Sequence, residues 1–468
     1  MGSTEDPIVA RLKERYRPAV AVGGDSAPGL ASTGAGMIVR VLDGRAAGWA
    51  VRRSFAPNSV TGISLALGLC AAAWFTAGTP AGNASGALAL CGCYLAGHGA
   101  SAVTASSASG LAGAPWLARM CSVTVECAVY AGLAAGAGAA GWDGTWQLAV
   151  TLTVLLAIRQ TVSACRGAPR RGAGEAGIVD RATEAILTMP PGGRILLIAV
   201  AAPAWGPQAA LLGLVTWAIA AIGYAIAGHR GDRVPHGQVS PGQVPPGQVP
   251  PGQVSNGRVP PGGSDRSPAN SAGEPARHDL APLLACRDDG AFASFAGQLV
   301  RGQLVPLPPA LAGLAAASML AVLGLRNLPG AIALTPLVVM LLAAPGSSHR
   351  HDGRLDWLVP AVLQAGQYIY IAALGFASGV PGPVIFALCA MIAIRSADLA
   401  YQAENGQPQA AATAGAGMGW EGRMLAAGLG AILGIATFAY LALAAYLGAL
   451  ICRKILASCL MPAREDRW

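Results

Sequence analysis

Ionisable side chains in the second half of the chain gather just outside predicted apolar helices. They are His349, His351, Asp352, Arg354, Asp356, Arg395, Asp398, Glu421 and Arg423. Carboxylates and guanidiniums mixed at such a rim can hold a metal ion together with a phosphate or an anionic headgroup. The alternative is that these charges set the orientation of the helices and pair with one another. His349 and His351 are too close in sequence to share one helix face, so they indicate no metal site by themselves.

A second pair of candidate groups, His98 and Glu126, lies inside apolar stretches of the first half. An acidic group within a membrane segment is costly and therefore worth explaining. One carboxylate and one imidazole facing a common cavity could take part in chemistry. The alternative is a buried glutamate that is hydrogen-bonded to another helix.

The composition places both sets of residues in a membrane protein. The chain has 468 residues, of which 53% are hydrophobic and only 12% are charged; soluble domains have about 25% charged residues. This argues against a disordered chain and against a soluble multi-domain enzyme. The net charge of +8 comes from arginines scattered around apolar stretches, a pattern that fits cytoplasmic loops better than nucleic-acid binding.

Apolar stretches long enough to cross a membrane occur in two groups. The first is predicted near 59–78, 84–106, 116–140, 144–163, 194–206 and 207–228, and the second near 307–325, 328–344, 357–378, 380–395 and 423–452. The sequence thus predicts an all-α, polytopic integral membrane protein with a bundle of six helices followed by a second bundle of about five. Pro203 and Pro207 predict a tight turn between the fifth and sixth helices.

A linker rich in proline and glycine separates the two groups. Residues 237–263 repeat the unit PGQV, which cannot bury a core and favours an extended, semi-rigid spacer. The predicted organisation is therefore an N-terminal segment (1–53), a first membrane module (54–230), the linker region (231–279), a second membrane module (280–455) and a polar tail (456–468).

The arginines predict how the helices are oriented. The N-terminal segment, the linker and most other arginine-bearing segments fall on one side of the predicted spans, which we expect to be the cytoplasm. Arg453 and Lys454 follow the eleventh predicted span and disagree with this arrangement. Either the last span is broken or re-entrant, or the number of spans is off by one. The expected location is the cell membrane, with the N-terminus and the linker in the cytoplasm.

Several short segments of the first module resemble a known family. Residues 55–61 read FAPNSVT, residues 116–117 read WL, residues 126–133 read ECAVYAGL and residues 190–194 read PPGGR. Over about 50–230 these segments resemble the CDP-alcohol phosphotransferases (phosphatidyltransferases) of phospholipid synthesis, whose membrane bundle has six helices. The resemblance implies a substrate or lipid groove, for which the candidate residues are Pro57, Asn58, Thr61, His98 and Glu126.

The catalytic motif of that family is degenerate here. Members carry DxxDGxxAR followed, after eight residues, by GxxxDxxxD, and the four carboxylates hold Mg²⁺ or Mn²⁺ against the CDP pyrophosphate. The corresponding positions, counted back from the WL and ECAVYAGL segments, are Gly97, Ala100, Ala118 and Ser122. No Asp or Glu occurs between residues 44 and 125. The resemblance therefore implies the family's scaffold without an intact catalytic site, and no metal cofactor.

The second module resembles an uncharacterised actinobacterial membrane domain that often follows such phosphotransferase-like modules. The matching segments read VRGQLVPLPP at 300–309, DGRLDWLVP at 352–360, QAGQYIY at 364–370 and GWEGRM at 419–424. This resemblance implies no particular activity.

Three functions fit these observations. The first is a catalytically inactive relative of the phosphotransferases with a scaffold, regulatory or lipid-binding role. The second is a membrane enzyme of lipid or cell-envelope metabolism whose site is the rim of the second module. The third is a transporter, which the lack of an inverted repeat disfavours. The expected partners are membrane lipids and either a second copy of the chain or another membrane enzyme, and no nucleic acid.

Overall fold

The computed structural model describes residues 57–106, 114–166, 191–228, 288–293, 295, 307–324, 338–339, 342–343, 356–405 and 417–460. Every regular element within these residues is helical, as the sequence predicts. The elements are α3 (Pro57–Phe75), α4 (Pro80–Ser106), α5 (Ala114–Ala139), α6 (Thr145–Arg166), α8 (Pro191–Trp205), α9 (Pro207–Gly228), α12 (Leu307–Gly324), η3 (Asp356–Leu358), α14 (Val359–Ala377), α15 (Gly382–Glu404), α17 (Gly419–Ile432) and α18 (Ala436–Leu460).

Seven of the described helices are long and apolar enough to cross a membrane, namely α3, α5, α6, α9, α14, α15 and α18. Two others, α8 and α12, are apolar but shorter. These helices are consistent with a multi-pass membrane protein. The finer prediction of six plus five spans is not reproduced in the described residues, and the span predicted near 328–344 lies largely outside them.

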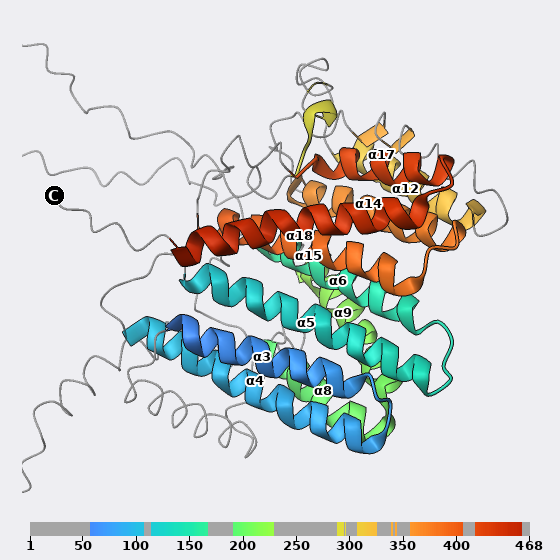
Figure 1. Cartoon of the computed structure of the whole chain (residues 1–468). Coiled ribbons are helices and arrows are strands. Elements are labelled where there is room, and N and C mark those ends of the chain that lie inside the picture. The colour runs from blue at the N-terminus through green and yellow to red at the C-terminus, as the bar shows by residue number, and fades with distance from the viewer. Residues whose placement is uncertain are drawn as a thin grey trace, which may run out of the picture.

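Short turns connect helices at one end of the molecule, which lies to the right in Figure 1. We call this the turn end, and it comprises residues 76–79, 140–144, 206, 378–381 and 433–435. The opposite end, where the helices lead into longer connections, is the open end. Gly206, at φ 92°, forms the break between α8 and α9. The predicted turn is therefore present, although Pro203 itself lies inside α8.

The prediction of one last span near 423–452 is wrong. Residues 419–460 form two helices, α17 and α18, with a turn between them. Gly434 in that turn adopts φ 72°, a left-handed conformation that glycine takes without steric cost and that commonly ends a helix. Because α18 returns to the open end, Lys454 lies beside Asp398 of α15. The last segment is therefore broken, which is one of the two explanations for the position of Arg453 and Lys454 relative to the other basic residues.

Glycines allow two helices of the first module to approach closely. A Cβ atom added at Gly132 of α5 would lie 2.3 Å from the Ala72 carbonyl oxygen, and one at Gly136 would lie 2.0 Å from that of Phe75. Both oxygens belong to α3, so only glycine fits at these two positions. Close backbone contact through small residues is typical of membrane helix pairs.

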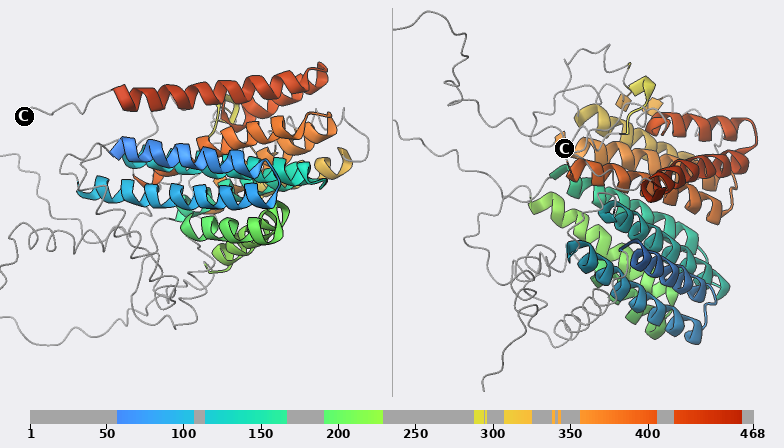
Figure 2. Two further views of the ribbon diagram at one scale, coloured as in Figure 1. Left: turned by 60° about the horizontal axis from the view of Figure 1, so that its bottom comes forward. Right: turned by 60° about the vertical axis from the view of Figure 1, so that its left-hand side comes forward.

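α15 lies at the centre of the molecule and joins the two modules (Figures 1 and 2). It packs on α5 and α6 of the first module and on α14 and α18 of the second. At its start, Gly382 lies against the Trp146 side chain, and the Phe386 ring meets the Trp146 ring edge-on with 5.8 Å between centroids. Because one hydrophobic core includes residues of both modules, the two helix groups form a continuous packed unit.

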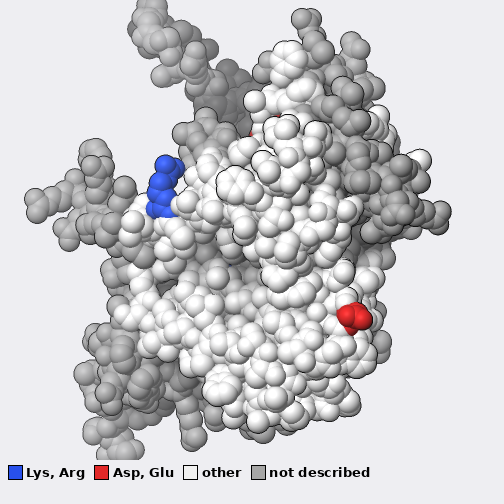
Figure 3. All heavy atoms as spheres, turned by 45° about the vertical axis from the view of Figure 1, so that its right-hand side comes forward, with Lys and Arg blue, Asp and Glu red and all other residues white. Residues whose placement is uncertain are grey.

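The outer surface of the described helices is strongly apolar. Large exposed side chains include Trp74, Leu88, Trp205, Ile219 and Phe438. On the face shown in Figure 3, almost all of the described surface is uncharged, and the basic and acidic groups that are visible lie at opposite edges. An exposed apolar surface of this extent fits contact with lipid.

Candidate functional site

Asp398 of α15 receives hydrogen bonds from three helices near the open end. Its Oδ1 accepts from Trp116 Nε1 of α5 at 2.7 Å and from Lys454 Nζ of α18, and its Oδ2 accepts from Arg395 Nη1 at 3.3 Å. The Lys454 ammonium also lies 4.8 Å from the centroid of the Trp116 ring, a cation–π contact. Asp398 is only 3% exposed, so these donors replace the water that its charge would otherwise need.

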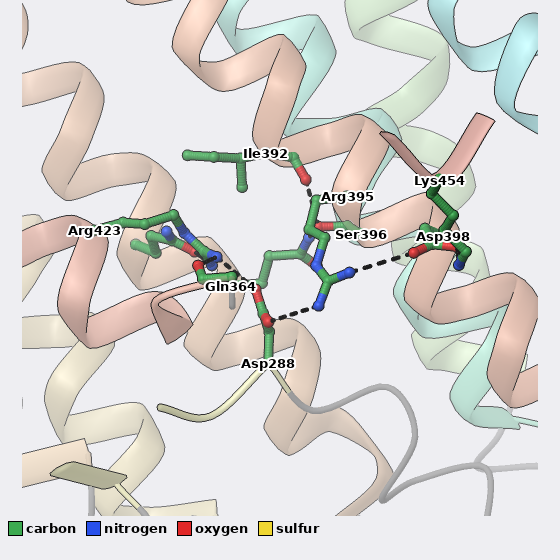
Figure 4. Close-up of polar contacts among 10 residues, drawn as sticks. Asp288, Gln364, Ile392, Arg395, Ser396, Asp398, Arg423 and Lys454 are labelled. Carbon is green, nitrogen blue, oxygen red and sulfur yellow. Dashed lines mark hydrogen bonds and ion pairs between the residues drawn. The ribbon is translucent and has the colours of Figure 1, made fainter. Parts of the chain in front are cut away.

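Asp288 lies between two guanidiniums that come from different helices (Figure 4). Arg423 Nη1 of α17 is 2.6 Å from Asp288 Oδ2, whereas Arg395 Nη2 of α15 is 3.9 Å from Oδ1. Arg423 also donates to the Gly417 carbonyl at 3.0 Å and to Gln367 Oε1 of α14 at 3.1 Å. Arg423 is 1% exposed, which makes it a fully buried cation that depends on these partners.

The segment that carries Asp288 is attached to the first turn of α17. The backbone N–H of Trp420 donates to the Asp288 carbonyl at 3.0 Å, and its indole N–H donates to Asp289 Oδ1 at 3.2 Å. Glu421 Oε1 accepts from the Ala293 N–H at 3.0 Å. Glu421 lies outside the seven candidate spans; burial raises the pKa of its carboxyl, and the backbone N–H groups that it accepts from oppose this rise.

A partly open cavity lies beside these ionic groups, where the two modules meet. Thr161 of α6, Gln364 and Gln367 of α14 and Ser396 of α15 contribute polar walls, and Asp288, Asp289 and Arg423 complete them. Gln364 bridges the modules, because its Oε1 accepts from Thr161 Oγ1 at 2.5 Å and its Nε2 donates to Ser396 Oγ. Gln367 is 1% exposed, and its Nε2 is buried without a hydrogen-bond partner. The cavity can therefore accept a small polar or anionic group.

The structure brings together Arg395, Asp398 and Arg423 of the predicted rim and places Glu421 beside them. Asp352 and Arg354 lie outside the described residues. Asp356 begins η3, and its side chain is likewise not described. Of the predicted rim, the structure therefore describes the side chains of only the four residues on α15 and α17, and the site itself stays a prediction.

Sequence reasoning missed several members of this network. Gln364 and Gln367 stand one helical turn apart in an otherwise apolar stretch, and this spacing was the available signal for a buried polar face. Trp116 and Lys454 reach Asp398 from distant parts of the chain. Asp288 follows the linker region, and nothing in its local sequence predicts a contact with two arginines of α15 and α17.

In the first module, the four degenerate motif positions lie on two helices. Gly97 and Ala100 are on α4, and Ala118 and Ser122 are on α5; Ala100 is buried and Ser122 is exposed. The metal that the resemblance implies needs oxygen ligands, mostly carboxylates. Gly and Ala side chains supply no ligand and Ser122 supplies one hydroxyl, so these positions do not fit such a metal site.

Glu126 is held in a buried ion pair with a neighbouring helix. Its Oε2 lies 2.9 Å from Arg194 Nη1 of α8, and the two side chains are 9% and 8% exposed. Two arginines approach the Trp217 ring of α9: the guanidinium carbon of Arg194 (α8) is 5.9 Å from the ring centroid, and that of Arg159 (α6) is 4.8 Å from it. This agrees with the alternative of a buried glutamate bonded to another helix.

The remaining groove candidates have varied surroundings. Pro57 begins α3, Asn58 is exposed and Thr61 is buried. His98 is exposed, and its ring contacts the Tyr94 ring of the same helix in a tilted arrangement, with 4.2 Å between centroids and 43° between the ring planes. Because Glu126 is buried against α8, His98 and Glu126 have different environments.

These features describe an all-helical protein with several helices fit to cross a membrane and a buried ionic network where two helix groups meet. Residues 276–460 match the model of a protein family described as a family of unknown function (DUF5941). The matched range contains Asp288 and every described helix from α12 to α18. No curated protein and no solved structure matches the chain.

Proposed function

We propose that the chain is a multi-pass protein of the cell membrane whose open end faces the cytoplasm. Every Lys, Arg, Asp and Glu on the described helices lies in the half of its helix nearer the open end, and Asp143 is the one described charged residue at the turn end. Basic residues favour the cytoplasmic side of membrane helices. This arrangement supports a cytoplasmic location for the N-terminal segment and the linker.

The first module acts in this proposal as a catalytically inactive, phosphatidyltransferase-like scaffold that holds the second module and contacts lipid. The proposal rests on the contacts of α5. This helix carries Ala118 and Ser122 at the positions where the phosphatidyltransferases have acidic residues. The polar residues near them on α5 contact α15: Trp116 donates to Asp398, and Arg119 lies 3.5 Å from Glu404. The helix that would hold half of a metal site therefore serves as a docking face.

An activity assay tests the loss of catalysis. The purified full-length chain is incubated with CDP-diacylglycerol, a set of acceptor alcohols and Mg²⁺ or Mn²⁺, and CMP release is measured. We expect no release above a control without protein, because the carboxylates that would neutralise the pyrophosphate are missing. Turnover that depends on both the donor and the metal would overturn the proposal.

A cleavage experiment tests the scaffold role. A protease site is inserted into residues 237–263 of the full-length chain, which is cleaved after purification in detergent. We expect the two halves to elute together, and to separate more easily in the Trp116→Phe, Arg119→Ala double variant. If the halves of the chain with an unmodified interface separate immediately after the linker is cleaved, the scaffold role is contradicted.

The second candidate is a membrane enzyme of lipid or cell-envelope metabolism whose site is in the second module. The cavity beside Arg423 and Gln367 favours it, because this cavity has polar walls and a buried, unpartnered amide that could hydrogen-bond to a small polar group. Complementation of a deletion strain separates the candidates. If this candidate is correct, Gln367→Leu abolishes complementation at unchanged protein level, whereas Glu126→Ala preserves it in proportion to its protein level. Full complementation by Gln367→Leu would count against an enzyme site here.

A further inference from the structure

The fit between Asp288 and the two arginines around it is incomplete. One carboxylate oxygen makes a short contact with Arg423 at 2.6 Å, but the other is 3.9 Å from Arg395. Hydrogen bonds between nitrogen and oxygen are typically about 2.7–3.2 Å long, and a separation of 3.9 Å is too long for one. Asp288 Oδ1 is accordingly buried without a hydrogen-bond partner. The carboxylate is therefore too small to satisfy both guanidiniums at once.

Two donors on the same wall also lack acceptors. Arg423 Nε and Gln367 Nε2 are buried without a hydrogen-bond partner, and both residues line the cavity that Asp288 borders. Leaving a buried donor unpaired is costly. A carboxylate offers two oxygens, whereas a phosphate offers at least three, arranged around a larger tetrahedral centre. A phosphate group is therefore the better match for the place of the Asp288 carboxylate, which has the Arg423 guanidinium at 2.6 Å, the Arg395 guanidinium at 3.9 Å and the Gln367 amide on the same cavity wall.

The helices around this space carry an excess of positive charge. Three cations, Arg395, Arg423 and Lys454, stand against two helix-borne acids, Asp398 and Glu421. Asp398 is engaged by Trp116, Arg395 and Lys454. Of the other nearby acids, Glu421 accepts from the Ala293 N–H and does not line the cavity, and Asp289 belongs to the same segment as Asp288. Asp288 and Asp289 would leave together, so displacement of their segment exposes a basic site.

We propose that Arg395, Arg423 and Gln367 form a binding site for a phosphate group, and that the Asp288 carboxylate is a built-in competitor which occupies it. A dianionic phosphate can replace Asp288, since charge-assisted bonds to guanidinium are strong and its extra oxygens reach the unpaired donors. The site lies near the open end, so a lipid phosphomonoester and a soluble phosphate could both reach it. This inference concerns ligand binding and holds whether or not the first module is catalytically inactive.

Binding measurements on the full-length chain test the site. Inorganic phosphate is titrated calorimetrically into the protein in an uncharged detergent. Separately, native mass spectrometry measures retention of phosphatidic acid over phosphatidylcholine from mixed micelles. The variants are Asp288→Asn, which keeps the size of the side chain but removes its charge, and the double variant Asp288→Asn, Arg423→Gln. Asp143→Asn at the turn end is the matched control, and elution volume and melting temperature verify the fold of each variant.

We expect Asp288→Asn to bind at least one of the two probes about tenfold or more tightly than the unmodified chain, because the charge that competes for the site has been removed. A tenfold change in affinity corresponds to about 1.4 kcal/mol. Asp143→Asn should leave the affinity unchanged, and the double variant should lose the gain. Binding of inorganic phosphate identifies a soluble ligand, and retention of phosphatidic acid alone identifies a lipid headgroup. Equal affinity of Asp288→Asn and the unmodified chain, no binding of either probe, or undiminished binding by the folded double variant would overturn the proposal.

Discussion

Replacing Asp398 by alanine perturbs the best-connected acid of the buried network. The carboxylate is 3% exposed, and its removal leaves the Trp116 indole N–H without its acceptor and weakens the pairing of Arg395. Removing one partner of a buried ion pair costs about 3–5 kcal/mol. Lys454 adds little to this loss, because its side chain is 40% exposed and can be hydrated. We therefore expect Asp398→Ala to lower the free energy of unfolding by about 3 kcal/mol.

Unfolding by SDS in mixed micelles, followed by circular dichroism, measures this change. Trp116→Phe is the matched variant: it keeps an aromatic ring beside Lys454 but removes the 2.7 Å hydrogen bond, and it should cost about 1 kcal/mol. The double variant should lose little more than Asp398→Ala alone, since both changes remove the same bond. The reasoning is refuted if Asp398→Ala costs less than about 1 kcal/mol, or if the two losses simply add.

Three further changes are measured in the same unfolding assay. Glu126→Gln removes the charge that compensates Arg194 and should cost about 3 kcal/mol; an unchanged midpoint would contradict a buried ion pair at this position. Gly136→Ala should destabilise the chain strongly, because the added Cβ would lie 2.0 Å from a backbone oxygen of α3, whereas Gly62→Ala, with nothing within 4 Å, should be neutral or slightly stabilising. Tyr440→Phe removes a buried 2.6 Å hydrogen bond to a backbone carbonyl of α14 and should cost about 1 kcal/mol; no change would indicate that the hydroxyl is solvated.

Much of the helical fold could be predicted from hydropathy alone. Apolar runs of sufficient length indicate helices regardless of how they pack, and the predicted spans fall on described helices wherever the structure describes them. The exception is the last span, because an uninterrupted apolar run does not show where a helix turns back. Leu433 and Ile435 maintain the hydropathy through the turn, and Gly434 is one glycine in a chain that contains 63.

The candidate site could be predicted only in part. Arg395, Asp398 and Arg423 stand out because charged residues are rare in apolar sequence. Their partners are less visible: Trp116 is separated from Asp398 by 282 positions, and Thr161 is separated from Gln364 by 203. Such contacts depend on which helix faces meet, and hydropathy does not specify this when nearly every face is apolar.

The central place of α15 has a consequence for how the chain folds while it is being synthesised. α5 and α6 are complete once Arg166 has been synthesised, but α15 begins only at Gly382. Until then the faces around Trp116 and Trp146 have no helix to cover them, so lipid or an insertion chaperone must occupy them. Thr161 has another acceptor during this interval, because its hydroxyl can donate its proton to the Ala157 carbonyl oxygen, 3.1 Å away, instead of to Gln364. Ribosome pausing or premature termination between the modules would therefore leave the first bundle with these apolar faces uncovered, and such surface makes incompletely folded chains prone to aggregate.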